Sequence, residues 1–111
     1  MKRDTGFHDF VVHDLLYDIP ELKSKGMFGG WGLYAGDVFF AIITEGELYV
    51  KGDPELIALY QSLGSHPFTY DVKGRAHTLS YWLVPEEVFE DRDELARWVD
   101  AAIAVQKERK R

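Results

Sequence analysis

The stretch GMFGGWGLYAGDVFFAIITEGELYVK, residues 26–51, decides the fold of this chain. Its apolar and aromatic runs, broken by turn residues, predict three antiparallel strands joined by two tight turns. The strands cover residues 26–34, 37–43 and 47–51. Ala35-Gly36 makes the first turn, and Gly46 serves the second because glycine adopts positive φ without strain. The middle strand is apolar at nearly every position, so we expect both of its faces to be covered.

The flanking segments predict helices and one further hairpin. After a first helix, which Pro20 ends, residues 21–25 form a polar connection. Asp53 caps the second helix and Gly64 closes it, while Asp91 caps the last one. The helices cover residues 7–19, 53–64 and 92–107, with one helical turn at 85–89, and the hairpin strands cover 66–72 and 76–84. The order α-β-β-β-α-β-β-α predicts an α+β fold, a mainly antiparallel sheet with helices packed on it.

Composition excludes several classes of protein. The 111 residues indicate a single domain, 1–111, and the 46% of hydrophobic residues exclude a disordered chain. There is no cysteine, so disulfides, thiolate metal sites and cysteine nucleophiles are absent. No segment has the apolar length of a signal peptide or a membrane span. We therefore expect a soluble, cytoplasmic protein that does not bind membranes.

The glycines at the start of the 26–51 stretch raise the question of a phosphate-binding loop. The run Gly26, Gly29, Gly30 and Gly32 lacks both the G-x-G-x-x-G and the GK[ST] pattern, and it leads into a strand, where phosphate loops lead into a helix. Glycines inside strands mark bulges or close packing of backbones. We therefore interpret these glycines as structural, with a small-ligand pocket beneath them as an alternative.

The titratable residues predict no catalytic residue, no metal site and no cofactor. His8 lies on the apolar side of the first helix as a packed side chain, and His13 pairs with Asp9 one turn earlier. His66 and His77 lie at a turn and a strand start, and these spacings do not converge on a metal. The remaining candidates are carboxylates that form the acidic beginning of the last helix: Glu86, Glu87, Glu90, Asp91, Asp93 and Glu94.

The aromatic residues are the surplus that suggests an interaction surface. Aromatic side chains supply large contact area at protein interfaces, and the candidates on the strands are Trp31, Tyr49, Tyr81 and Trp82. We expect a protein partner or a homodimer. An alternative is nucleic-acid binding, in which the strand aromatics stack on bases beside the interleaved basic residues Lys51, Lys73 and Arg75. The basic tail at 107–111 would assist this binding. The net charge of −6 argues against nucleic acid as the partner.

Three segments resemble the TfoX (Sxy) N-terminal domain family. They are MFGGWGLYAGDVFFAIITEGELYVK at 27–51, SHPFTYDVKG at 65–74 and SYWLVPEEVFED at 80–91. The resemblance implies an α+β fold of the secretion-chaperone-like kind and kinship with competence regulators that act with the transcription machinery. It implies no catalytic residue and no cofactor. Longer members add a C-terminal domain of helix-hairpin-helix character, so we expect a stand-alone N-terminal domain here.

Overall fold

The computed structural model describes residues 5–27 and 29–109 as an α+β fold built on one six-stranded antiparallel sheet. The strand order is β1-β2-β3-β4-β6-β5, with every neighbouring pair antiparallel. The strands are β1 (Leu22–Met27), β2 (Gly30–Ala35), β3 (Val38–Thr44), β4 (Glu47–Lys51), β5 (Pro67–Val72) and β6 (Arg75–Leu83). The helices are α1 (Thr5–Asp9), a π-helix (Phe10–Leu15), a 3₁₀ turn (Pro54–Leu56), α2 (Ile57–Ser62), α3 (Glu86–Phe89) and α4 (Arg92–Arg109). The predicted fold class is confirmed.

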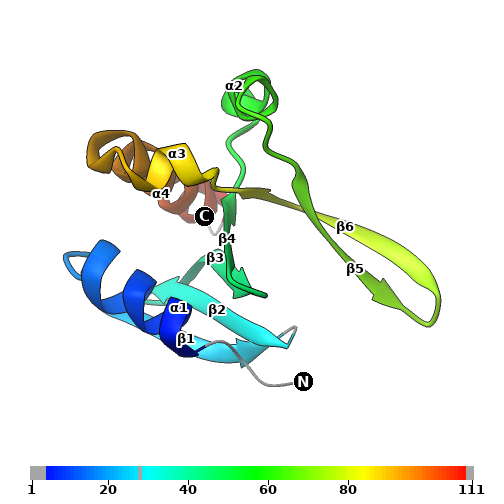
Figure 1. The fold of residues 1–111 in the computed structure, drawn as a ribbon, viewed down its shortest axis with the longest axis horizontal. Helices are drawn as coiled ribbons and strands as arrows, with labels where there is room; N and C mark the ends of the chain where they lie inside the picture. Colours follow the sequence, from blue (N-terminus) through cyan, green and yellow to red (C-terminus); the bar gives the residue numbers. More distant parts are fainter. Residues whose placement is uncertain (1–4, 28, 110–111) are drawn as a thin grey trace.

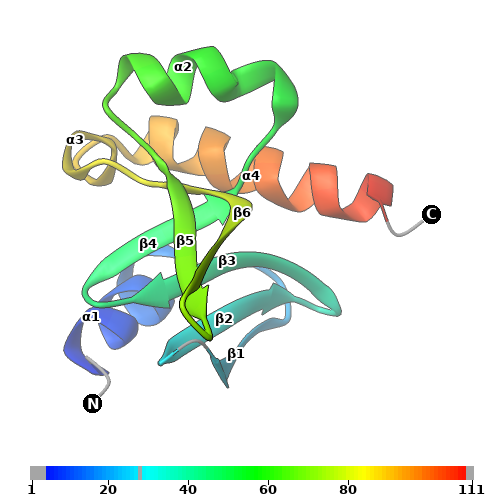
Figure 2. The same ribbon diagram turned by 90° about the vertical axis from the view of Figure 1, so that its right-hand side faces the viewer.

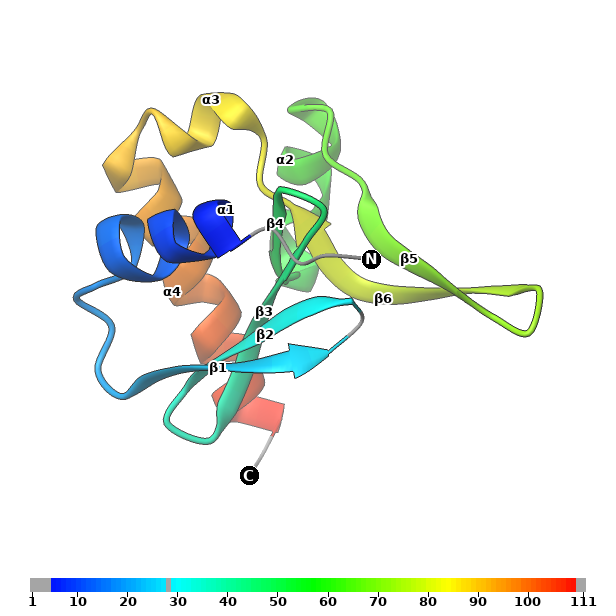
Figure 3. The ribbon, with the colours of Figure 1, turned by 60° about the horizontal axis from the view of Figure 1, so that its bottom comes forward.

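The helices and the β5–β6 hairpin lie on different sides of the molecule. In Figure 1, α1, α3 and α4 lie to the left, while the hairpin extends to the right as a twisted arm. The view in Figure 2 places that arm in front of β3 and β4, with α4 running across above them. Figure 3 shows α1 beside α3 and α4, on the side away from the hairpin. One face of the sheet is thus covered by helices, and the other is not.

The beginning of the sheet differs from the expected three strands. Residues 26–34 do not form one strand: Leu22–Met27 and Gly30–Ala35 form a hairpin, with Gly29 at φ 74°. The segment expected as a polar connection is therefore part of an edge strand, where most side chains are exposed. Edge strands carry lysines that discourage further pairing, and Lys23 and Lys25 fit that role. The sequence could not reveal β1 through an apolar pattern, because this strand has almost no apolar residues.

The first helix is shorter than expected and changes type along its length. It ends at Leu15 rather than Ile19, and its second half is a π-helix closed by a 2.9 Å hydrogen bond from the Leu16 amide to the Val11 carbonyl. A π-turn inserts one residue relative to the α-helical repeat. Val11 and Leu16, five residues apart, are both buried in the core.

Most local signals in the remaining chain are confirmed. Asp53 accepts a 2.9 Å hydrogen bond from the Glu55 amide, and Asp91 accepts one of 3.1 Å from the Glu94 amide, as N-caps do. Gly64 follows α2 at φ 80°. The second hairpin and the turn at α3 fall where the sequence placed them, and α4 continues two residues beyond 107.

A β-bulge explains why β3 is apolar throughout. Leu33 lies opposite Ala41 and Tyr34 opposite Phe39, which leaves Phe40 without a partner in the register. The extra residue lets Phe40 and Ala41 both pack in the main core while Phe39 packs on the other face. Both faces of β3 are covered, as expected, but only one of them is covered by helices.

The close packing predicted for the glycines is confirmed at two positions. A Cβ on Gly30 would collide with the carbonyl oxygen of Ile43 on the neighbouring strand. A Cβ on Gly32 would collide with Met27 and Phe39. Glycine is required at position 30, where backbone atoms occupy the space, whereas at position 32 the neighbouring side chains would have to move.

Candidate interaction surfaces

The four aromatic residues proposed as one interaction surface lie in three different places. Trp31 is half-buried beneath α1, with its ring 4.4 Å from that of His8. Tyr49 and Tyr81 are buried in a small cluster on the face opposite the helices. Trp82 is buried in the main core beside Tyr60. That these residues contact a partner stays a prediction, and any contact through the three buried ones must include the side chains around them.

The histidines contribute packing and local hydrogen bonds. His8 packs as expected, with Nδ1 3.0 Å from Asp9 Oδ1 and Nε2 3.0 Å from Ser24 Oγ. Asp9 is thus paired with His8, and the expected pairing with His13 is wrong. His66 and His77 are exposed on opposite ends of the second hairpin. Within residues 5–27 and 29–109, no three metal-binding side chains gather at one point.

An apolar groove lies between α1 and α3, and the start of the π-helix supplies its most exposed aromatic side chain. Phe10 is 43% exposed there. The rings of Phe7 and Phe89 meet edge to face at 6.1 Å and join the two walls. The groove has a volume of about 580 Å³, with Leu48 and Val84 also lining it.

The rim of this α1–α3 groove is acidic. Glu86 and Glu90 line it, and no lysine, arginine or histidine among the described residues does. The acidic cluster seen in the sequence therefore has a second consequence besides favouring the start of α4. It surrounds an apolar surface with negative charge.

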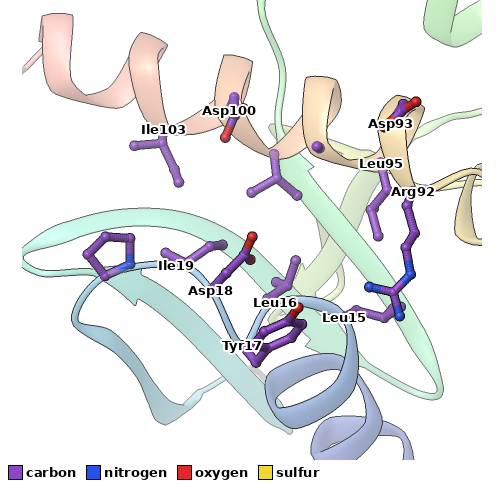
Figure 4. A pocket seen from close by; sticks show the side chains of 13 residues that line it. Leu15, Leu16, Tyr17, Asp18, Ile19, Arg92, Asp93, Leu95, Asp100 and Ile103 are labelled. Atoms are coloured by element: carbon purple, nitrogen blue, oxygen red, sulfur yellow. The ribbon is translucent and has the colours of Figure 1, made fainter.

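A second groove, of about 370 Å³, separates the loop after the π-helix from α4. Figure 4 shows Asp18 and Asp100 extending into it from opposite sides, with Arg92 at one end. Leu16 and Leu95 form part of its buried wall. Because both signs of charge line this groove, its chemistry indicates no single class of ligand.

The sheet face opposite the helices, which we call the open face, carries its own apolar cluster. Every member lies on a strand, so no helix contributes to it: Phe39, Ile42, Tyr49, Phe68, Tyr70, Leu79, Tyr81 and Leu83. Neighbouring rings contact one another along the face. Tyr34 stacks on Phe39 at 5.2 Å, Phe39 lies 5.1 Å from Tyr81, and Tyr49 lies 5.2 Å from Phe68.

Polar groups of the open face meet near the end of α4. Gln106 Nε2 donates to the Phe39 carbonyl at 2.8 Å and lies 3.1 Å from the Tyr81 hydroxyl, which donates to the same carbonyl at 3.2 Å. Burial raises the pKa of Tyr81 well above its ordinary value. Burial, followed by the hydrogen bond to Glu47, raises the pKa of Tyr49 to about 12. Both hydroxyls are therefore neutral donors at physiological pH.

Lys51 is the buried charged residue of this face. The residue as a whole is only 8% exposed, and Nζ lies 5.5 Å from the centre of the Tyr81 ring. Desolvation, and secondarily the positive charge of Arg109, lower its pKa. A hollow of about 300 Å³, which we call the Lys51 hollow, opens over it. Asp37, Phe39, Lys51, Gln106 and Arg109 line this hollow.

Sequence reasoning anticipated part of this arrangement. Alternation along residues 47–51 indicates that Tyr49 and Lys51 point to one face of the strand, and they do share it. The exposure of Phe10 was missed, because a regular helix gives no warning of a π-turn. The Lys51 hollow was also missed, since its walls come from three segments distant in the chain.

Comparisons with known proteins agree with this fold and its motifs. The sequence profile of the TfoX N-terminal domain matches residues 14–106. The DNA transformation protein TfoX1 of Aliivibrio fischeri is 38% identical over 68 residues, covering 61% of this chain and 32% of that protein. Protein Sxy of Escherichia coli is 28% identical over 91 residues, covering 79% of this chain and 42% of that protein.

This chain therefore spans about a third to two-fifths of the length of these relatives. In the described part of the chain, no helix has the length and apolar character needed to cross a membrane. The match over most of its length shows that the chain belongs to the TfoX N-terminal domain family.

Proposed function

We propose that this chain is a regulatory protein-interaction domain of the competence-regulator kind, without catalytic activity of its own. Its family membership and the name of its relative, a DNA transformation protein, support a regulatory setting. The partner expected from the resemblance is a component of the transcription machinery. The contact surface that we propose is the α1–α3 groove.

The observation that carries this proposal is the accessible aromatic wall of that groove, chiefly Phe10. Phe10 and Phe89 offer aromatic surface beside Leu48, in a volume that accepts several side chains. Apolar grooves between elements receive the apolar face of an amphipathic segment. Burying such anchors supplies most of the binding free energy at protein interfaces.

The charge of the rim specifies the partner further. Glu86 and Glu90 border the groove without a compensating cation among its lining residues. Complementary charge accelerates association and excludes partners of like charge. The bound segment should therefore carry lysine or arginine beside its apolar anchors.

Selection from a random peptide library on the immobilised chain tests this proposal. We expect enriched peptides with bulky apolar residues flanked by lysine or arginine. Phe10→Ser should abolish their binding, and Glu90→Lys should weaken it strongly. Glu55→Lys is the control, because Glu55 is exposed on the 3₁₀ turn outside the groove. Failure to enrich any peptide, or enrichment that both groove variants retain, contradicts the proposal.

Self-association is a second part of the proposal, since the partner can be another copy of the chain. Light scattering at micromolar concentration measures it directly. A dimer that Phe10→Ser converts to a monomer would assign the groove to self-recognition. A monomer at all concentrations would end this part and leave the peptide-binding part intact.

A further inference from the structure

We infer that the open face binds single-stranded nucleic acid, with strand lysines and arginines contacting phosphates and half-buried rings stacking on bases. None of the cations and half-buried rings that carry this inference lines the α1–α3 groove, so it is independent of the proposed function.

The first support is the distribution of charge on the strands. Directly opposite residues of an antiparallel pair share a face, and alternate residues of one strand do so too. Lys23 lies opposite Tyr34, and Lys25 Nζ lies 5.0 Å from the centre of the Tyr34 ring. Lys51 lies opposite Tyr81. Arg75 lies two residues before His77, whose ring stacks on Tyr70 at 5.5 Å.

All four strand cations within the described residues therefore share the open face. The strands carry only two carboxylates, Glu47 and Asp71. Glu47 lies on the open face, where its carboxylate accepts the Tyr49 hydroxyl at 3.0 Å, and Asp71 points to the opposite face from Tyr70. The net charge of −6 is thus concentrated on helices and turns. A phosphate backbone on the open face would meet locally positive charge.

The second support is the row of stacked rings along the same face. Tyr34 and Phe39 are stacked at an interplanar angle of 27°, and Tyr70 and His77 at 26°. Tyr34, Phe39 and Tyr70 are only half-buried. Aromatic platforms beside a basic surface bind single strands because every unpaired base offers a π-face. Paired bases in a duplex cannot offer theirs, so the rings select single strands.

The third support is the position of the Lys51 ammonium group at the Lys51 hollow. It has no hydrogen bond and no carboxylate within 4.0 Å among the residues that the structure describes, although the residue as a whole is only 8% exposed. The group borders the Lys51 hollow together with Arg109, and a phosphate there would accept hydrogen bonds from both. Asp37 lines the same hollow and would oppose an anion.

Fluorescence anisotropy with the full 111-residue chain and labelled oligothymidylate of about 12 nucleotides tests this inference. We expect binding at low salt that weakens steeply as salt rises, because phosphate contacts release counterions. A duplex of the same length should bind at least about tenfold more weakly. Inorganic phosphate should compete only at high concentration, since it lacks bases.

Variants separate the phosphate contacts from the stacking contacts. Lys25→Ser and Arg75→Ser should each weaken binding about fivefold and reduce the salt slope by about one. Tyr34→Leu should weaken binding about tenfold and leave the salt slope unchanged. Asp37→Asn should strengthen binding, which no loss of folding can imitate. Circular dichroism and thermal unfolding verify that each variant is folded.

Arg97→Ser is the matched control, because Arg97 is an exposed cation on α4, 72% accessible and away from the open face. It should bind like the unaltered chain. Three results would overturn the inference. They are no binding at about 20 mM salt, equal affinity for the duplex, and an effect of Arg97→Ser as large as that of Lys25→Ser.

Discussion

The two faces of the sheet are built from the same strands but differ in what covers them. On one face, helices bury a large core in which Leu33, Leu48 and Trp98 are entirely inaccessible to solvent. On the open face the strands cover themselves, and Tyr34, Phe39 and Tyr70 remain half-buried. The difference indicates that the two faces of the sheet have different roles. The helix-covered face provides most of the stability, and the open face is free to serve recognition.

The sharpest way to break this comparison is to remove a large side chain from the helix-covered face. Trp98 is fully buried, and its indole donates to Glu94 at 3.2 Å. Trp98→Ala should lower the free energy of unfolding by about 3–5 kcal/mol, because a cavity replaces the largest side chain of the core. Urea denaturation followed by circular dichroism measures this. A loss below about 1 kcal/mol would show that α4 contributes little to stability.

The spacing between β2 and β3, which both faces share, should be the next most sensitive feature. Gly30→Ala places a methyl group against the Ile43 carbonyl and should cost about 1–3 kcal/mol. Gly29→Ala is the control: Gly29 has positive φ but no atom within 4 Å of a Cβ. Gly29→Ala should lower the free energy of unfolding by about 1 kcal/mol, and this loss measures the backbone strain alone. Equal midpoints of unfolding for the two variants would contradict the close approach of Gly30 to the Ile43 carbonyl.

A truncation on the open face should cost less than one in the main core. Leu79 is half-buried there and packs on a cluster without helices. Leu79→Ala should lower the free energy of unfolding by about 1 kcal/mol. If the loss equals that of Trp98→Ala, the open face is a structural core, and its availability for binding must be reconsidered.

The smallest effect concerns ionisation on the open face. Folding raises the pKa of Tyr49 from 10.0 to about 12, so the neutral hydroxyl contributes stability in full below pH 10 and loses it as pH rises through about 12. Tyr49→Phe should therefore make stability less dependent on pH in this window. Urea midpoints at about pH 9 and about pH 11 measure the slope for both chains. An unchanged slope would mean that Tyr49 does not titrate differently in the unfolded chain.

How far the sequence predicts this molecule depends on whether a signal is local. Asp53 and Gly46 act through their own backbone, so their roles were readable from the sequence. The strand β1 was not, because an exposed edge strand needs no apolar residue and is specified by pairing with β2. The π-helix was also hidden, since it depends on packing at both Val11 and Leu16.

The candidate surfaces follow the same division. Alternation indicates that Lys51 shares the face of Tyr49, but it cannot show that Lys51 has no acidic partner among the residues that the structure describes. That outcome depends on β6 and on α4, which arrive from distant parts of the chain. Likewise, Trp82 and Tyr81 are adjacent in sequence, and only the sheet shows that one faces the helices and the other the open face.

The bulge at Phe40 links the shapes of the two faces. It adds one side chain to the helix-covered core while leaving Phe39 and Ile42 on the open face. A bulge also increases the local twist of a strand. A chain lacking Phe40 would keep simple alternation but would have a flatter sheet and a void beneath α4. Relatives that differ in length at this position should consequently present open faces of different curvature, and differ in the ligands that those faces accept.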